Sequence, residues 1–340
     1  MRMVKLAERP VGMVKASDFS IEDASTPEPS KGEFRVKVEY ISIDPAMRPW
    51  MNDVPSYIPP VQLGEVMRAL ASGTVEASNH PDFKEGDAVS GMFGVQTHAI
   101  SDGKGVTKLD LSIAPLERWI AGLGMPGMTA YFGLFNVAHP KKGEAVVISA
   151  ASGAVGSLVG QMAKINGCRV VGIAGGPEKC NAVMEMGFDA CVDYRADNLA
   201  EDLGAACPDG IDIYWENVGG EISDTVFQQM NLFGRIAVCG LISFYNATKP
   251  PVGPVNTRFI LGKRLRVQGF IVFDYTDRYQ EAVDEMGKWL SQGKLKMRED
   301  VREGGVDAFA DVLNLLYTGG NNGKLVLKTI KAPCAGQTSH

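Results

Sequence analysis

The segment "ISAASGAVGSLVGQMAK" (residues 148–164) carries three glycines in a spacing that would let an anion approach the backbone closely. Gly153 and Gly156 lie where an apolar stretch changes into an amphipathic helical pattern, and Gly160 lies inside that pattern. A strand, a glycine turn and a helix N-terminus together direct backbone N–H groups and the positive end of the helix dipole at a ligand. We interpret the segment as the pyrophosphate-binding turn of a dinucleotide site, with Gly160 allowing the helix to pack tightly on a sheet.

This glycine pattern departs from the usual fingerprint, because Ala150 stands where the first glycine is expected. The alternative is an ordinary tight connection between a strand and a helix. A preceding strand, a following helix and a second strand about twenty residues further on favour the dinucleotide interpretation. The cofactor contacts predicted here are Ala150, Gly153, Ala154, Val155 and Gly156.

The end of the second strand, "GIAGGPEK", indicates which dinucleotide is bound. Enzymes that use NAD place an acidic residue there to bind the ribose hydroxyls, but this chain has Ala174 followed by Gly175 and Gly176. An acid would repel a 2′-phosphate, whereas small residues leave room for it. Lys179 begins the next helix and can reach such a phosphate, although an exposed surface lysine is the alternative. Tyr194 and Arg195 are possible second contacts, and the pattern favours NADP(H).

The secondary-structure pattern of the elements that must position these residues changes near residue 120. Residues 1–120 read as β-rich, with "GEFRVKVEYISID" (32–44) alternating in the manner of a half-exposed strand. From 121 to 304, apolar strands alternate with helical patterns, which predicts a parallel, doubly wound sheet. The strand-like "GKLVLK" (323–328) is expected to return to the first domain, so that 305–330 belongs to it. Residues 331–340 are expected to be a disordered tail.

Composition excludes several other functions. The chain has 34 basic and 40 acidic residues and no basic run, which argues against a nucleic-acid partner. No apolar run approaches the ~20 residues of a membrane helix, and no signal peptide is evident, so we expect a soluble cytoplasmic protein. None of the 6 cysteines precedes residue 168 or forms a CxxC pair, and the 4 histidines are scattered. We therefore expect free thiols and no metal site.

At the level of longer motifs, the chain resembles the zinc-independent branch of the medium-chain dehydrogenase/reductases, which contains leukotriene/prostaglandin reductases, curcumin reductases and plant double-bond reductases. The match covers about residues 10–330. The stretches that carry it are "SIDPAMR" (42–48), "PSYIPPVQLGEVM" (55–67), "GMPGMTAYFGL" (124–134), "AASGAVGSLVGQMAK" (150–164), "GIAGGPEKC" (172–180), "ENVGGE" (216–221), "GRIAVCGLISFYNAT" (234–248), "LRVQGFIVFDY" (265–275) and "GGNNGK" (319–324).

The resemblance implies a GroES-like catalytic domain beside a Rossmann domain that binds NADP(H). It also implies that Asn217 lies beside the cofactor backbone, Asn322 near the nicotinamide end, and Thr129 near the nicotinamide pocket. For the two asparagines a turn role is the alternative, since Asn tolerates left-handed backbone. Members of the zinc-dependent branch have a catalytic cysteine early in the chain and a lobe with four cysteines. This sequence has neither.

Reduction of a carbon–carbon double bond conjugated with a carbonyl is the chemistry that the resemblance implies. Negative charge then develops on the carbonyl oxygen, where a hydrogen-bond donor stabilises it. Tyr57 and Tyr245 are the candidate donors by resemblance, and the cofactor ribose hydroxyl is an alternative. Several relatives carry a pocket tyrosine just ahead of the strand "RLRVQGF", but "NTRFILGKRLRV" has none. A quinone reductase and a non-catalytic NADP-binding protein remain alternatives, and a homodimer is expected.

Overall fold

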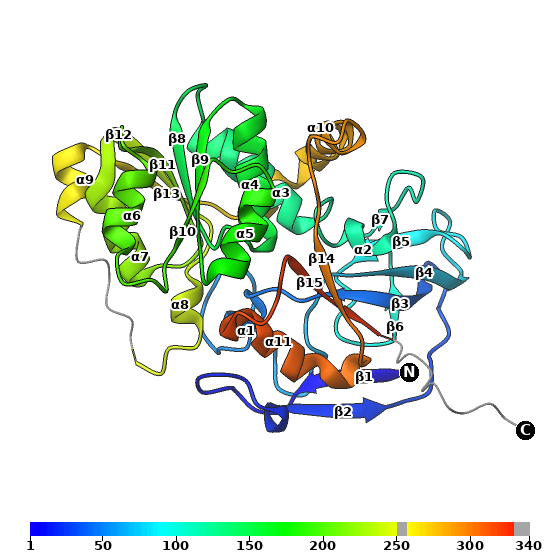
Figure 1. Cartoon of the computed structure of the whole chain (residues 1–340). Helices are drawn as coiled ribbons and strands as arrows, with labels where there is room; N and C mark the ends of the chain where they lie inside the picture. Colours follow the sequence, from blue (N-terminus) through cyan, green and yellow to red (C-terminus); the bar gives the residue numbers. More distant parts are fainter. Residues whose placement is uncertain (250–256, 330–340) are drawn as a thin grey trace, which may run out of the picture. The chain divides into compact units, whose positions relative to one another are not determined.

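The computed structural model describes residues 1–249 and 257–329, which divide into two compact units (Figure 1). Unit 1 comprises Met1–Ala121 and the chain from Glu299 onward, and unit 2 comprises Gly122–Arg298. The boundary expected at 304/305 lies six residues too late, because strand β14 (Glu299–Arg302) pairs in parallel with β15 (Lys324–Lys328) of unit 1. The predicted disordered tail, 331–340, falls outside the described residues.

Unit 1 is built on a mainly antiparallel sheet with the strand order β14-β15-β3-β4-β5-β7, to which β6 adds by pairing with β3. The alternation predicted for β3 (Phe34–Ser42) is confirmed, since Phe34, Val36 and Val38 are fully buried in the core. The return of β15 to this unit is also confirmed, because it pairs with β3. The other elements of the unit are β1 (Arg2–Leu6), β2 (Phe19–Asp23), α1 (Met47–Trp50), β4 (Ala71–Ser78), β5 (Ala88–Gly91), β6 (His98–Ser101), β7 (Thr107–Lys108), α2 (Leu116–Trp119) and α11 (Phe309–Thr318).

Unit 2 contains a parallel sheet with the strand order β10-β9-β8-β11-β12-β13, flanked by helices (Figure 1). Every residue of β8 is buried, as its continuous apolar run predicts for a strand covered on both faces. Its elements are α3 (Met125–Phe132), β8 (Ala145–Ser149), α4 (Ala154–Ile165), β9 (Arg169–Ala174), α5 (Pro177–Glu185), β10 (Ala190–Asp193), α6 (Leu199–Ala206), β11 (Ile211–Glu216), α7 (Gly220–Gln229), β12 (Met230–Val238), α8 (Ile242–Tyr245), α9 (Arg258–Lys263), β13 (Arg266–Gly269) and α10 (Tyr279–Ser291).

The strand order of unit 2 reverses between β8 and β11, which are neighbours in the sheet but lie far apart in the chain. From β8 the chain proceeds outward through β9 and β10, and it then crosses back to β11 and proceeds the other way. In open α/β sheets, ligands bind outside the carboxyl ends of the strands at such a reversal. The residues that follow Ser149 and Glu216 therefore occupy the position where a dinucleotide is expected.

Candidate functional site

The turn between β8 and α4 leaves the first amides of the helix available to a ligand. Gly153 is the N-cap residue, and no side chain caps the helix there. The first helical hydrogen bond runs from Ser157 N to Gly153 O at 3.0 Å, so the backbone N–H groups of Ala154 and Val155 lie in the first turn, where the helix offers no acceptor. Uncapped N–H groups at the positive end of a helix dipole suit a phosphate.

Packing within the protein requires the two other glycines of the motif to lack a side chain. A Cβ on Gly156 would lie 2.5 Å from the carbonyl oxygen of Ala150, so the helix begins directly against the turn. A Cβ on Gly160 would lie 1.9 Å from the ring of Phe188. Gly160 was predicted to let α4 pack closely on the sheet. In the structure it makes room for the ring of Phe188.

Ala150 adopts the conformation that the missing first glycine would provide. Its φ is 50°, in the left-handed region, and its carbonyl oxygen accepts a 2.9 Å hydrogen bond from Gly153 N. The left-handed conformation costs about 1–2 kcal/mol for a residue with a Cβ. The chain thus makes the fingerprint turn with a strained alanine.

Asn217, at the carboxyl end of β11, is fixed to the end of β8. Its Nδ2 donates to Ser149 O at 2.7 Å, and its backbone N donates to Ser149 Oγ at 2.8 Å. Its Oδ1 accepts a 3.1 Å hydrogen bond from the indole of Trp215. The side chain thus bridges the two strand ends at the switch point, beside the turn that begins at Ala150.

A buried carboxylate, which sequence reasoning missed, holds together the same two strand ends, those of β8 and β11. Glu216 is 3% exposed, and its Oε1 accepts hydrogen bonds from Ser149 Oγ, Tyr214 Oη, Val218 N and Gly219 N at 2.7–3.1 Å. Burial raises the pKa of Glu216, although these hydrogen bonds oppose the rise. Its other oxygen accepts from Ser223 Oγ. The available signal was an acid directly after the apolar run "IYW" at the end of the strand "IDIYWE".

Two cations and an aromatic ring meet at the ends of β9 and β10. The ring of Tyr194 lies over Gly175, where a Cβ would come within 2.8 Å of it, and the Arg195 guanidinium lies 5.9 Å from the centre of that ring. Burial lowers the pKa of Lys179, and the Arg195 charge lowers it further. Asp193 accepts hydrogen bonds from Gly176 N and Arg195 N at 2.7 and 2.9 Å. We call Gly175, Lys179, Tyr194 and Arg195 the cationic corner; a bound anion would stabilise it.

Tyr245 lies close to Asn217, whereas Thr129 lies on a separate helix of the same unit. Tyr245 Oη accepts a 3.2 Å hydrogen bond from Leu241 N, and Ile242 N donates to Asn217 O at 3.1 Å. Thr129 Oγ1 donates to Met125 O at 2.7 Å within α3.

The remaining predicted residues, Tyr57 and Asn322, belong to unit 1. Tyr57 is 48% exposed, and its hydroxyl accepts a 2.9 Å hydrogen bond from Trp50 Nε1. Asn322 N donates to Asp300 Oδ2 at 2.9 Å, while its Oδ1 is buried and has no hydrogen-bond partner among residues 1–249 and 257–329. Two residues later, the buried Lys324 donates to Asp44 Oδ1 at 2.6 Å, which anchors this segment to the end of β3.

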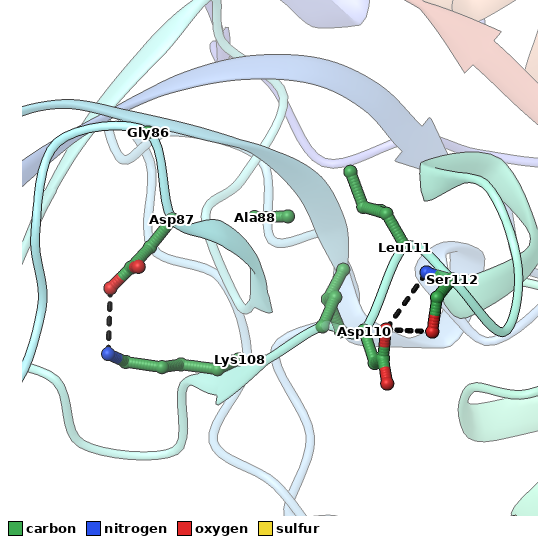
Figure 2. A pocket seen from close by; sticks show the side chains of 8 residues that line it. Gly86, Asp87, Ala88, Lys108, Asp110, Leu111 and Ser112 are labelled. Atoms are coloured by element: carbon green, nitrogen blue, oxygen red, sulfur yellow. Dashed lines mark hydrogen bonds and ion pairs between the residues drawn. The ribbon is translucent and has the colours of Figure 1, made fainter.

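Other features of the described chain add no further site. Figure 2 shows a shallow hollow on unit 1 whose polar groups pair with one another, Lys108 with Asp87 at 2.7 Å and Ser112 with Asp110 at 2.6 Å. It contains none of the predicted residues. Within residues 1–249 and 257–329, no cluster of three or more His, Cys, Asp or Glu side chains could hold a metal ion, and no helix is long and apolar enough to span a membrane.

Comparison with known proteins agrees with this geometry. Residues 2–109 match the family model described as the N-terminal domain of oxidoreductase, and residues 154–288 match the one described as zinc-binding dehydrogenase. The NADPH-dependent curcumin reductase of Escherichia coli (strain K12) is 46% identical over 331 residues, 95% of each chain. Prostaglandin reductase 1 of Mus musculus is 39% identical over 93% of this chain and 95% of its own.

Among solved structures, that of CurA from Vibrio vulnificus in complex with NADPH superimposes with a TM-score of 0.93 at 44% identity. The match covers 98% of this chain and 100% of the other. Identity of this extent along nearly the whole length is accompanied by the same β-rich domain and Rossmann sheet. The chain therefore belongs to the zinc-independent branch of the medium-chain dehydrogenase/reductase family.

Proposed function

We propose that this protein reduces the carbon–carbon double bond of α,β-unsaturated ketones and aldehydes with NADPH. The observation that carries the cofactor assignment is the cationic corner at the end of β9, where an acid would stand in an NAD enzyme. The names of the curcumin and prostaglandin reductases support the reaction class.

The residues present fit such a cofactor. The amides of Ala154 and Val155 would bind the pyrophosphate, and Lys179 and Arg195 would bind the 2′-phosphate. Tyr194 offers a ring face beside Gly175 for the adenosine. The buried Oδ1 of Asn322, which has no partner in the part of the chain that the structure describes, is an acceptor suited to the N–H of a carboxamide. Thr129 and Asn217 complete the proposed contacts.

When bound, NADPH supplies the hydride that reduces the β-carbon of the substrate. The protein's part is to hold the substrate carbonyl against a hydroxyl donor while negative charge develops on its oxygen. We assign that part to Tyr57 or Tyr245. The indole of Trp50 donates to the Tyr57 oxygen at 2.9 Å, which orients the Tyr57 hydroxyl. A proton from a tyrosine, the ribose hydroxyl or water then reaches the α-carbon.

Product analysis tests this function. The purified protein is given a simple α,β-unsaturated ketone, an enal and a quinone with NADPH or NADH, and products are identified by mass spectrometry and NMR. A saturated ketone formed with NADPH supports the proposal. An allylic alcohol, or turnover only with the quinone, contradicts it. Activity is expected to be unchanged by metal chelators, because the proposed chemistry requires no Lewis acid.

The proposal includes a homodimer formed at the sheet edge of unit 2. The edge strand β13 is exposed at all four residues, and the exposed Val267 lies on it. Two such edges can continue one sheet across a two-fold axis. Sedimentation at several concentrations should give twice the mass of one chain. A cytoplasmic location also belongs to the proposal, in agreement with the five described cysteines, which are free thiols.

A further inference from the structure

One cation of unit 1, Arg68, lies beside Tyr57 and uses little of its hydrogen-bonding capacity within residues 1–249 and 257–329. The guanidinium carbon of Arg68 lies 5.7 Å from the centre of the Trp50 ring, within the range of a cation–π contact. The same indole donates its N–H to the Tyr57 hydroxyl at 2.9 Å. Arg68, Trp50 and Tyr57 therefore form one connected group, which we call the Arg68 cluster.

The guanidinium groups of two other arginines near this segment donate hydrogen bonds to several protein groups. Arg48 donates to Gly12 O, Pro10 O and Asn52 Oδ1, and Arg9 donates to Met51 O and Val61 O. Arg68, in contrast, donates one hydrogen bond, from Nη1 to Pro59 O at 2.8 Å, among the residues that the structure describes. It has no ion pair there within 4.0 Å, so its remaining N–H groups are available.

The surroundings of Arg68 strengthen its attraction for an anion. Its side chain is half-buried, and this burial lowers its pKa, while the charges of Glu65 and Tyr57 act in the opposite direction. The Glu65 carboxylate is held by Gln62 N at 2.9 Å and forms no ion pair with Arg68. A partly desolvated guanidinium with a planar set of free donors binds a carboxylate in a two-point geometry.

The same loop also exposes apolar surface. Val54 and Leu63, in the segment that carries Tyr57, are 55% and 56% exposed. A saturated chain could lie on such surface while its charged end reaches Arg68. We propose that Arg68 is a specificity-determining residue that binds a carboxylate carried by the substrate at some distance from the double bond, so that the enzyme prefers acidic enones to neutral ones. This inference rests on the proposed function, because it takes Tyr57 to contact the substrate.

The experiment compares a vinyl ketone whose saturated chain ends in a carboxylate with its methyl ester. Wild type should reduce the acid with the higher kcat/KM, and the acid-to-ester ratio should fall about tenfold in Arg68→Met, the scale of one charge-assisted hydrogen bond. Arg68→Lys keeps the charge without the planar fork and should fall in between. Lys31→Met removes one exposed positive charge from the same unit and should leave the ratio as in wild type.

A binding measurement keeps the test independent of turnover. Calorimetry with NADP⁺ present gives Kd for the corresponding saturated keto acid and keto ester, with the same acid-to-ester comparison across the variants. An equal loss for both compounds in Arg68→Met, or an equal change in Lys31→Met, would overturn the role of Arg68. If neither vinyl ketone is reduced but the Kd ratio depends on Arg68, the proposed reaction fails and the carboxylate site stands.

Discussion

The hydroxyl of Ser149, at the end of β8, lies 3.1 Å from Oε1 of Glu216, at the end of β11. It also accepts the backbone N–H of Asn217 at 2.8 Å. One buried side chain thus ties together the two strand ends on either side of the switch point, and Glu216 holds the following turn through Val218 N and Gly219 N. The position of Asn217, a proposed cofactor contact, depends on this buried network.

Glu216→Gln should therefore weaken both the fold and cofactor binding. The amide oxygen can still accept from Val218 N and Gly219 N, but these hydrogen bonds are no longer charge-assisted, and the Ser223 hydroxyl must turn round to accept from the NH₂ group. We expect a loss of about 1–3 kcal/mol. We expect Tm to fall by roughly 5 °C and Kd for NADPH to rise, measured by thermal melting and fluorescence titration. Glu185→Gln, at an exposed position, is the control. An unchanged Kd would mean that the network does not position the site.

Lys179→Ala should separate the two dinucleotides. Loss of a charge-assisted hydrogen bond to the 2′-phosphate should weaken NADPH binding by about 10- to 100-fold and leave NADH nearly unaffected. Calorimetric titration of both cofactors measures this, with the exposed Lys288→Ala as the control for net charge. Equal losses for NADPH and NADH would contradict the assignment of the cationic corner.

Ala150→Gly should stabilise the protein. Relief of the left-handed strain at φ 50° should raise the free energy of unfolding by about 1–2 kcal/mol. The greater freedom of glycine in the unfolded chain should lower it by about 0.4–1 kcal/mol. Thermal melting should show a rise in Tm of a few degrees. Ala151→Gly, next to it but fully buried and without positive φ, should lower Tm instead.

Tyr57→Phe and Tyr245→Phe test the donor role. At least one of them should lower kcat by roughly tenfold or more, because a donor that stabilises developing negative charge is lost. Kd for NADPH should remain as in wild type. Steady-state kinetics with a simple enone and a parallel cofactor titration provide the measurements. If both variants keep full turnover, the ribose hydroxyl or water becomes the preferred donor.

Acid stability should depend on Glu144. Burial would raise the pKa of Glu144, but the Arg235 guanidinium, at 2.6 and 2.8 Å from its two oxygens, and Lys141 N hold it below its usual value of 4.5 overall. A lowered carboxyl pKa contributes stability above the ordinary pKa and loses it as pH falls through the folded-state value. Glu144→Gln should therefore melt below wild type near pH 7, and the difference should shrink toward about pH 3. A constant difference across that range would contradict the ion-pair argument.

Local patterns accounted for the elements that frame the site. The apolar run of β8 and the amphipathic run of α4 are short-range signals, and α4 (Ala154–Ile165) covers the amphipathic part of the segment quoted first. The missing acid after Ala174 likewise needed only the local sequence. The conformation of β8 and α4 thus follows mainly from the residues within each element.

Partners distant in sequence were the part that could not be predicted. The helical pattern of "SDTVFQQMNLF" (223–233) continues past Gln229, but α7 ends there because Met230 pairs with Ile211 and so begins β12. Glu216 finds Ser149 on a strand 67 residues away, and no local pattern announces that contact. The same holds for the Arg68 cluster, where a bend of the loop brings Tyr57 onto Trp50.

The sheet of unit 1 has a consequence for the order in which the chain folds. Its strand β3 pairs with β15, with Ser42 opposite Val326, whereas unit 2 occupies one continuous stretch of chain. During synthesis the Rossmann sheet can be completed while β15 is still to be made, since domains fold as units from the N-terminal side. Until then the end of β3 keeps an open edge, which is a template for pairing with other chains. Dependence on chaperones should therefore be greatest in the interval between the emergence of β3 and that of β15 from the ribosome.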